Sequence, residues 1–224
     1  MRRRLVGWFL LAELAVYLLF LWLDLFCGGA GSAPVKYAAI ALCFFFSLYG
    51  SVRGGERLVT AALAFTLGAD TFLLLLDARY LAGVLLFCVV QGLYLARILR
   101  ENGGHALWPL RLGLFAVALW VLRRLGMLSL LNGVTAFYFN NFLVNVIQSL
   151  SLRGLRLRLF SLGLALFLCC DLCVGAFNEP GLVPSAVYSF ARVGMWLFYL
   201  PAQVLIALSG LPDPVLRGLD DENQ

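Results

Sequence analysis

The chain has 224 residues, of which 62% are hydrophobic and 13% are charged, and its mean hydropathy is +0.93. Soluble domains are usually about 45–50% apolar and about 25% charged. This composition excludes a soluble globular enzyme and a disordered chain. The net charge of +5 points to orientation in a lipid bilayer and not to nucleic-acid binding, because the basic residues lie between apolar runs.

The apolar residues form continuous runs of the length that a membrane-spanning helix needs. A helix crosses the hydrocarbon core with about 20 apolar residues, whereas a transmembrane barrel needs short alternating strands. Eight spans would occupy roughly 160 residues, which leaves short loops and no separate soluble domain. We therefore predict an all-α polytopic membrane protein, a single integral membrane domain over residues 1–224 with about eight transmembrane helices.

Taken in chain order, the apolar runs and their breaks predict eight helices. The first run follows three arginines and is longer than the core of a signal peptide, so we expect an uncleaved helix. Glycine, proline or charged residues mark the breaks between runs. The expected helices are residues 5–26, 35–52, 58–76, 80–99, 107–122, 127–152, 159–177 and 183–208. Residues 212–224 are expected to form a polar cytoplasmic tail.

The basic residues fall mostly on one side of this helix arrangement. With the N-terminus inside, twelve of them face the cytoplasm and four face the outside, which is the asymmetry of the positive-inside rule. We expect both termini in the cytoplasm, and the plasma (inner) membrane if the source is bacterial. Leu58 and Asp70 are twelve residues apart, as are Leu159 and Asp171, which suggests a parallel 4+4 repeat.

Cysteine and histidine offer no evident metal site. The six cysteines lie mainly inside apolar runs, where cysteine packs as a small hydrophobic residue. Cys170-x-x-Cys173 has the spacing of a redox or zinc motif, but there is no second pair, and His105 is the one histidine. We expect no metal and no cofactor.

Two aspartates are the strongest candidates for chemistry. An ionisable group inside a span costs about 2.5–3.5 kcal/mol on insertion scales and marks a functional site by default. Glu13, Asp70 and Asp171 meet this criterion, and the two aspartates lie at matched depth. In one interpretation each aspartate is protonated and bonds to a neighbouring helix. In the other, both face one polar cavity, where two carboxyls that do not both ionise easily provide an acid and a base.

Polar side chains recur at helical spacing on other predicted helices. Asn141, Asn145 and Gln148 share one helix face, and further pairs share a face on two other helices. Such residues either join helices through hydrogen bonds or bind a substrate. The candidate substrate-binding residues are Gln91, Tyr94, Asn141, Asn145, Tyr199 and Gln203.

Three segments resemble the YhhN-like lysoplasmalogenases, a family of eight-helix membrane hydrolases. The first is Leu67-Gly68-Ala69-Asp70 followed by Gly83, Phe87, Gln91 and Tyr94. The second is Gly163-x-x-x-Phe167-x-x-x-Asp171 followed by Phe177, and the third is Tyr199-x-x-Ala202-Gln203-Val204-Leu205-Ile206. Gln91 stands where the family usually has histidine, Cys170 where it has serine, and Leu200 where a second tyrosine is common.

The resemblance implies hydrolysis of the vinyl ether of a lysoplasmalogen, a lysophospholipid, to a fatty aldehyde and a glycerophospho head group. Protonation of a vinyl ether at carbon creates an oxocarbenium ion that water captures, which requires an acid and a carboxylate, as in glycosidases. Asp70 and Asp171 fit these two catalytic roles. The alternative is a small proton-coupled transporter or a non-catalytic lipid-binding protein, in which the aspartates would hold protons. The sequence leaves the oligomeric state open.

Overall fold

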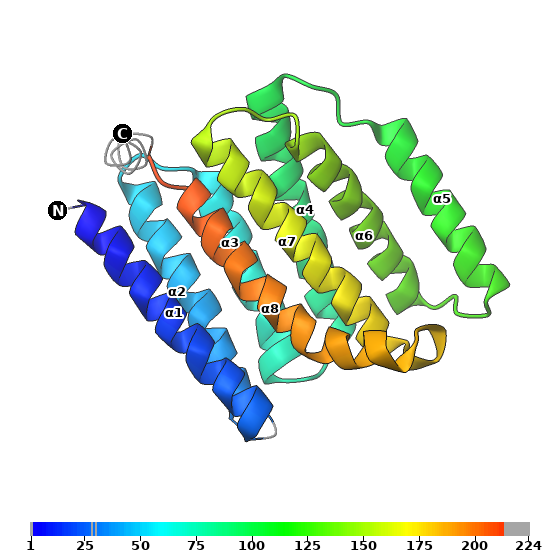
Figure 1. Cartoon of the computed structure of the whole chain (residues 1–224). Coiled ribbons are helices and arrows are strands. Elements are labelled where there is room, and N and C mark those ends of the chain that lie inside the picture. The colour runs from blue at the N-terminus through cyan, green and yellow to red at the C-terminus, as the bar shows by residue number, and fades with distance from the viewer. Residues whose placement is uncertain (1, 28, 30, 213–224) are drawn as a thin grey trace.

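A computed structural model describes residues 2–27, 29 and 31–212, which form eight α-helices and no strand (Figure 1). The order is α1 (Arg2–Phe26), α2 (Ser32–Val52), α3 (Arg57–Asp70), the π-helix η1 (Thr71–Leu75), α4 (Tyr80–Asn102), α5 (Trp108–Arg124), α6 (Leu130–Ser149), α7 (Leu155–Asn178), the 3-10 turn η2 (Pro180–Leu182) and α8 (Ser185–Ser209). The predicted order of helices is confirmed, and when η1 is counted with α3, no predicted boundary differs by more than four residues. Most of the expected polar tail, residues 213–224, lies outside the described residues.

The helices have the length and composition of membrane spans. Within the described ranges, seven helical segments are long and apolar enough to cross a membrane, and the exception is α5. That helix has 17 residues and carries Arg111, Arg123 and Arg124, yet it lies alongside α6 at the edge of the bundle (Figure 1). The architecture is therefore the predicted polytopic membrane bundle, in which α1 begins and α8 ends at the same end (Figure 1).

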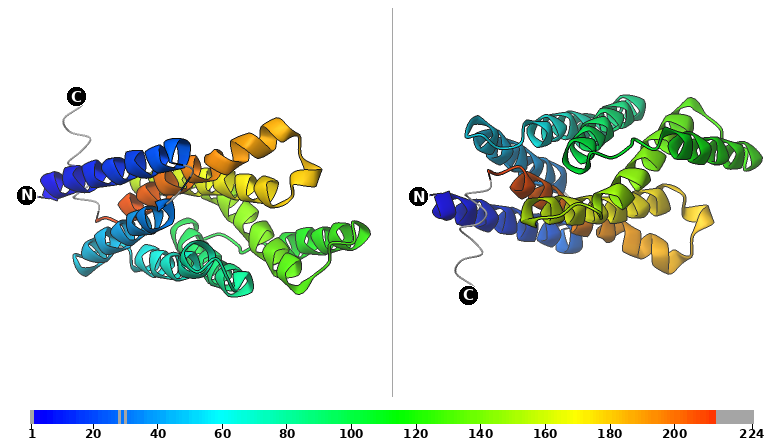
Figure 2. Two further views of the ribbon diagram at one scale, coloured as in Figure 1. Left: turned by 90° about the horizontal axis from the view of Figure 1, so that it is seen from below. Right: turned by 90° about the horizontal axis from the view of Figure 1, so that it is seen from above.

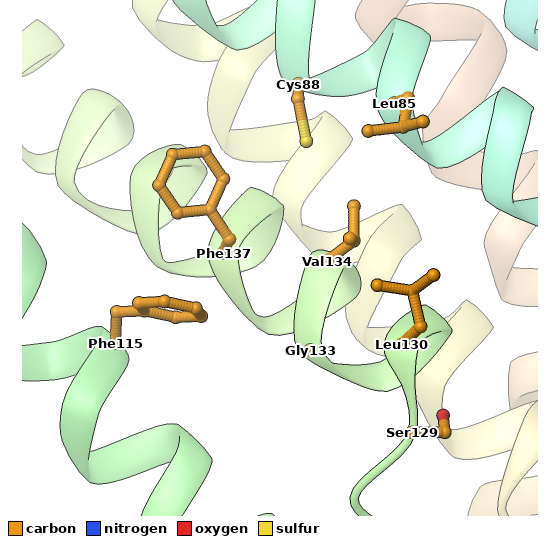
Figure 3. A pocket seen from close by; sticks show the side chains of 8 residues that line it. All are labelled: Leu85, Cys88, Phe115, Ser129, Leu130, Gly133, Val134 and Phe137. Atoms are coloured by element: carbon orange, nitrogen blue, oxygen red, sulfur yellow. The ribbon is translucent and has the colours of Figure 1, made fainter.

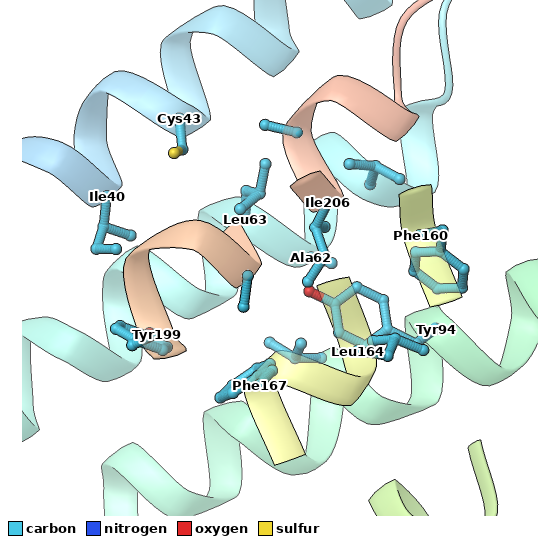
Figure 4. Close-up of a cluster of buried hydrophobic side chains, with 14 of the residues drawn as sticks. Ile40, Cys43, Ala62, Leu63, Tyr94, Phe160, Leu164, Phe167, Tyr199 and Ile206 are labelled. Atoms are coloured by element: carbon cyan, nitrogen blue, oxygen red, sulfur yellow. The ribbon is translucent and has the colours of Figure 1, made fainter. Parts of the chain in front are cut away.

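The helices pack as two closely joined pairs with the remaining helices around them. α7 lies along α8 and α3 lies along α4, while α2 contacts both α3 and α8 (Figures 1 and 2). α6 contacts α4, α5 and α7. The main apolar core lies where α2, α3, α4, α7 and α8 meet, and it includes Leu63, Leu164, Phe167 and Ile206 (Figure 4).

Two glycines of the family-like segments permit close helix contacts. A Cβ atom added at Gly163 of α7 would lie 3.0 Å from the Ala202 carbonyl oxygen of α8, and one at Gly83 of α4 would lie 2.5 Å from Cγ of Leu73 in η1. Small residues at such positions allow membrane helices to approach closely. The phenylalanines four residues after these glycines, Phe87 and Phe167, then meet edge to face with ring centroids 5.7 Å apart.

Candidate functional site

Asp70 lies at a break in helical geometry. It is the last residue of α3, after which the backbone continues as the π-helix η1, and π-turns occur frequently at functional sites. Its side chain is 5% exposed and accepts a hydrogen bond from the Tyr199 hydroxyl of α8 at 2.7 Å. The next residue, Thr71, has its hydroxyl oxygen 3.0 Å from that of Tyr37 in α2. Side chains of neighbouring helices thus contact both Asp70 and the first residue of the π-helix η1.

The helix that carries Tyr199 is itself irregular. Pro201 lies inside α8 and has no backbone N–H, so it cannot donate the usual helical hydrogen bond to the carbonyl of Leu197, four residues earlier. The Tyr17 hydroxyl of α1 donates a hydrogen bond to this carbonyl at 3.3 Å. α1 therefore supports α8 at the turn that presents Tyr199 to Asp70.

Asp171 lies within a regular helix. Its side chain is half-buried in α7, which continues as α-helix to Asn178. It accepts a hydrogen bond from the Tyr138 hydroxyl of α6 at 2.5 Å. Tyr138 was not among the residues predicted from the sequence, although its spacing of three and seven residues from Asn141 and Asn145 places all three on one helix face.

The two aspartate–tyrosine pairs belong to one aromatic cluster. The ring of Phe167 contacts the ring of Tyr199 with centroids 5.3 Å apart, and it also contacts Phe87. Phe87 in turn contacts Tyr138 at 5.8 Å. Cys170, another residue not selected from the sequence, directly precedes Asp171 in α7 and is buried. The structure thus brings Asp70 and Asp171 into one buried region made by α3, α6, α7 and α8.

The other predicted polar residues on α4 and α8 are buried near this region. Tyr94 is 1% exposed and packs edge-on against Phe160. Gln91 and Gln203 are almost fully buried. The side-chain nitrogen and oxygen of Gln203 and the side-chain nitrogen of Gln91 have no hydrogen-bond partner among the described residues. Buried amides of this kind have hydrogen-bonding capacity to offer a polar ligand.

The amide face of α6 binds an arginine of α5. Arg111 is 1% exposed, and its Nη1 donates to the side-chain and backbone oxygens of Asn141 at 3.1 and 2.9 Å. Its Nη2 donates to Asn145 at 2.8 Å and to Gln148 at 2.7 Å. The Asn145 amide also donates to the side chain of Gln91 at 3.0 Å. These amides therefore join α4, α5 and α6, and a role of Asn141 and Asn145 in substrate binding stays a prediction.

Comparison with protein-family models identifies the family. The model of the YhhN family matches residues 31–210, a range that contains both aspartates and both of their tyrosine partners. The chain belongs to the YhhN family. Neither a curated protein nor a solved structure matches the chain.

This YhhN-family chain also has an apolar groove of about 420 Å³ between α4, α5 and α6 (Figure 3). It is lined by Leu85, Cys88, Phe115, Ser129, Leu130, Gly133, Val134 and Phe137. These side chains provide neither a carboxyl group nor an imidazole, so the groove does not supply the groups for acid–base chemistry. Among the described residues of this family member, no three histidine, cysteine or acidic side chains are arranged to hold a metal ion.

Proposed function

We propose that this protein is a membrane hydrolase that cleaves the vinyl ether bond of lysoplasmalogens. The observation that carries the proposal is the pair of aspartate–tyrosine hydrogen bonds within one buried aromatic cluster. Acidic groups inside a membrane bundle are costly and are retained for function. The resemblance of three segments to lysoplasmalogenases, in a chain of the YhhN family, supports this substrate class.

The reaction needs one proton donor and one carboxylate. A proton is transferred to the vinyl carbon remote from the ether oxygen, which leaves an oxocarbenium ion at the carbon bonded to oxygen. Water adds to this carbon and gives up a proton, and the resulting hemiacetal collapses to a fatty aldehyde and the glycerophospho alcohol. The reaction consumes one water and no oxidant, and an acid and a base of the same residue type suffice, as in glycosidases.

The surroundings of the two aspartates suit different roles. Each tyrosine donates to Oδ2 of its aspartate, which orients the carboxyl and leaves Oδ1 to exchange a proton with substrate or water. Asp70 is 5% exposed, and we assign it the transfer of a proton to the vinyl carbon. Asp171 is half-buried and less enclosed by the bundle than Asp70, and we assign it stabilisation of the cation and activation of water.

The alternative of a proton-coupled transporter is less well supported. A carrier built from repeated halves has broken helices at corresponding positions. Here α3 changes to a π-helix after Asp70, whereas α7 continues without a break past Asp171. This asymmetry favours two different chemical roles over two equivalent proton sites.

The orientation in the bilayer is part of the proposal. Basic residues are concentrated at the end of the bundle where α1 begins and α8 ends, so the positive-inside rule places both described helix ends in the cytoplasm. In a bacterial cell this membrane is the plasma membrane. The α1–α2 turn and the nearby aspartates then lie toward the outer surface, where a lysophospholipid of the outer leaflet reaches them.

The test is release of fatty aldehyde from ethanolamine and choline lysoplasmalogens by the purified protein in detergent. We expect aldehyde from the wild type and release lowered by about 10²–10⁴-fold in Asp70→Asn and in Asp171→Asn. Asp77→Asn is the matched control, because Asp77 is an exposed aspartate of the α3–α4 turn that bonds only locally to Tyr80 in the hydrogen bonds described. A folded wild type without aldehyde release overturns the proposal, and normal turnover by either variant removes that aspartate from the mechanism.

A further inference from the structure

A buried ion pair lies at the end of the bundle that holds the α1–α2 turn. Nζ of Lys36 in α2 is 2.6 Å from Oδ2 of Asp24 in α1. The two side chains are only 7% and 17% exposed. Burying two charges carries a desolvation penalty that their mutual attraction often does not offset, so a gain in stability alone is a weak explanation for this pair.

Aromatic rings enclose the Lys36 ammonium. Its Nζ lies 4.4 Å from the ring centroid of Trp196 in α8 and 5.6 Å from that of Phe20 in α1. A cation above an aromatic face is attracted by the ring quadrupole, most strongly by tryptophan. Three helices thus build a small site that contains one positive charge, one negative charge and aromatic faces.

Two separate contacts connect this site to Asp70. The Trp196 ring meets the Tyr199 ring edge-on at 5.7 Å, and Tyr199 donates its hydrogen bond to Asp70. Independently, Tyr37 follows Lys36 in α2, and its hydroxyl lies against Thr71. Two aromatic residues, Trp196 and Tyr199, therefore link the ion pair to the Asp70 carboxyl.

The direction of the helices places the ion pair and the aspartates in the same half of the bundle. α3 and α7 both run toward the α1–α2 turn, and Asp70 and Asp171 lie in their second halves. In a lysoplasmalogen the ether oxygen and the phosphate are attached to the same three-carbon glycerol. When the vinyl ether is at Asp70, the phosphate must lie close by, and the Lys36–Asp24 pair is connected to Asp70 through Trp196 and Tyr199 in the same half of the bundle.

We propose that Lys36 and Asp24 form the head-group site of this hydrolase, an inference that rests on the proposed function. The Lys36 ammonium binds the phosphodiester, and the Asp24 carboxylate binds the ammonium group of ethanolamine or choline. The ring of Trp196 covers this ammonium group. The ion pair and the zwitterionic head group are complementary. Each charge exchanges one partner for another, so no charge remains buried and unpaired.

Steady-state kinetics on two substrates tests this assignment. The substrates are an ethanolamine lysoplasmalogen and a 1-alkenylglycerol, which has the same vinyl ether but no head group. We expect Lys36→Met and Asp24→Asn to raise KM for the lysoplasmalogen about 10- to 100-fold, the range of a lost charge-assisted hydrogen bond. We expect kcat, and both constants for the alkenylglycerol, to stay at wild-type values. An unchanged KM, or an equal loss on both substrates, overturns the inference.

A charge swap separates recognition from helix docking. The double variant Asp24→Lys, Lys36→Asp keeps opposite charges on α1 and α2 but exchanges their positions. If the pair recognises the head group, thermal stability recovers in the double variant while KM for the lysoplasmalogen stays raised. If the pair serves only to join the helices, the swap restores KM to the wild-type value, and the inference fails.

A binding measurement keeps this result separate from the proposed function. The probe is a 1-alkyl lysophosphoethanolamine, which carries the head group but no cleavable vinyl ether. We expect it to raise the Tm of the wild type and of Asp70→Asn but not of Lys36→Met. Probe binding that depends on Lys36 in a protein that releases no aldehyde overturns the hydrolase and leaves the head-group site. If the wild type releases aldehyde but the probe still raises the Tm of Lys36→Met, the hydrolase is supported and the head-group site is overturned.

Discussion

Asp70 and Asp171 are both aspartates within membrane-spanning segments, but they differ in the structure that surrounds them. Asp70 sits where α3 becomes a π-helix, and its tyrosine comes from α8 two residues before Pro201. Asp171 sits in an uninterrupted helix, and its tyrosine comes from the regular helix α6. Irregular backbone inside a bundle is tolerated where neighbouring groups satisfy the freed polar atoms. The Asp70 half of the site thus depends on several helices, and the Asp171 half on two.

This difference also bears on the parallel repeat. A 4+4 repeat predicts the observed close pairing of α3 with α4 and of α7 with α8. A strict repeat, however, would pair the aspartate of α7 with a tyrosine of α4, because the aspartate of α3 pairs with α8. The tyrosine that bonds to Asp171 comes from α6 instead. The repeat stays a prediction, and the hydrogen bonds of the two aspartates do not follow it.

The largest effect we expect comes from removing either of the two aspartate carboxyls. Asp70→Asn and Asp171→Asn should each lower kcat by about 10²–10⁴-fold, the usual contribution of general acid–base catalysis. Azide is a nucleophile that needs no base, so it should restore consumption of the vinyl ether in Asp171→Asn. It should not do so in Asp70→Asn, because no cation forms without the proton donor. Loss of the vinyl ether signal with and without azide measures this.

The opposite pattern of rescue would exchange the two roles. If azide restores vinyl ether consumption in Asp70→Asn and leaves Asp171→Asn inactive, then side-chain exposure does not decide which carboxyl activates water. The exposed Asp77→Asn variant serves as the control for azide effects that do not depend on the site.

A smaller effect should come from the tyrosines. Tyr199→Phe and Tyr138→Phe each remove one hydrogen bond to a carboxyl and leave the ring packing intact, so we expect activity to fall by about 10-fold. Interhelical hydrogen bonds in membrane proteins average about 0.6 kcal/mol. Because Asp70 is 5% exposed and Asp171 is half-buried, the loss of stability should be greater for Tyr199→Phe, since an unpaired polar group costs more the more fully it is buried. Thermal unfolding in detergent, measured beside turnover, tests this, and equal losses would contradict the contrast.

The sequence predicts the fold well because each span is an apolar run bounded by glycine, proline or charge. It also selects Asp70 and Asp171, since a carboxyl inside such a run is costly. It does not identify which neighbour meets a given helix face. Tyr138 is one aromatic residue in a chain that is 14% aromatic, and its role becomes visible only when α6 is packed against α7.

The amide face of α6 illustrates the same limit. The spacing of Asn141, Asn145 and Gln148 correctly predicts one shared face, but the pattern contains nothing that names its partner. The structure places Arg111 of α5 there. In the sequence this arginine counted only toward the charge on the cytoplasmic side, because Arg111 lies near a predicted helix end. Partners that come from distant segments depend on helix order in space, which a single sequence does not encode locally.

The smallest effect should come from the support of α8 by α1. Tyr17→Phe removes the hydrogen bond to the Leu197 carbonyl that Pro201 leaves without a helical partner. We expect a loss of about 0.6 kcal/mol in stability and a decrease of a few-fold or less in turnover, because Tyr199 shifts slightly relative to Asp70. The double variant Tyr17→Phe, Pro201→Ala should recover this stability, since alanine restores the backbone N–H that bonds to Leu197. If the double variant is no more stable than Tyr17→Phe, the tyrosine does not compensate for the proline, and the Asp70 half of the site depends on α8 alone.

Tyr17→Phe should leave the Asp171 half untouched, so azide rescue of Asp171→Asn in this background should equal that in the wild-type background.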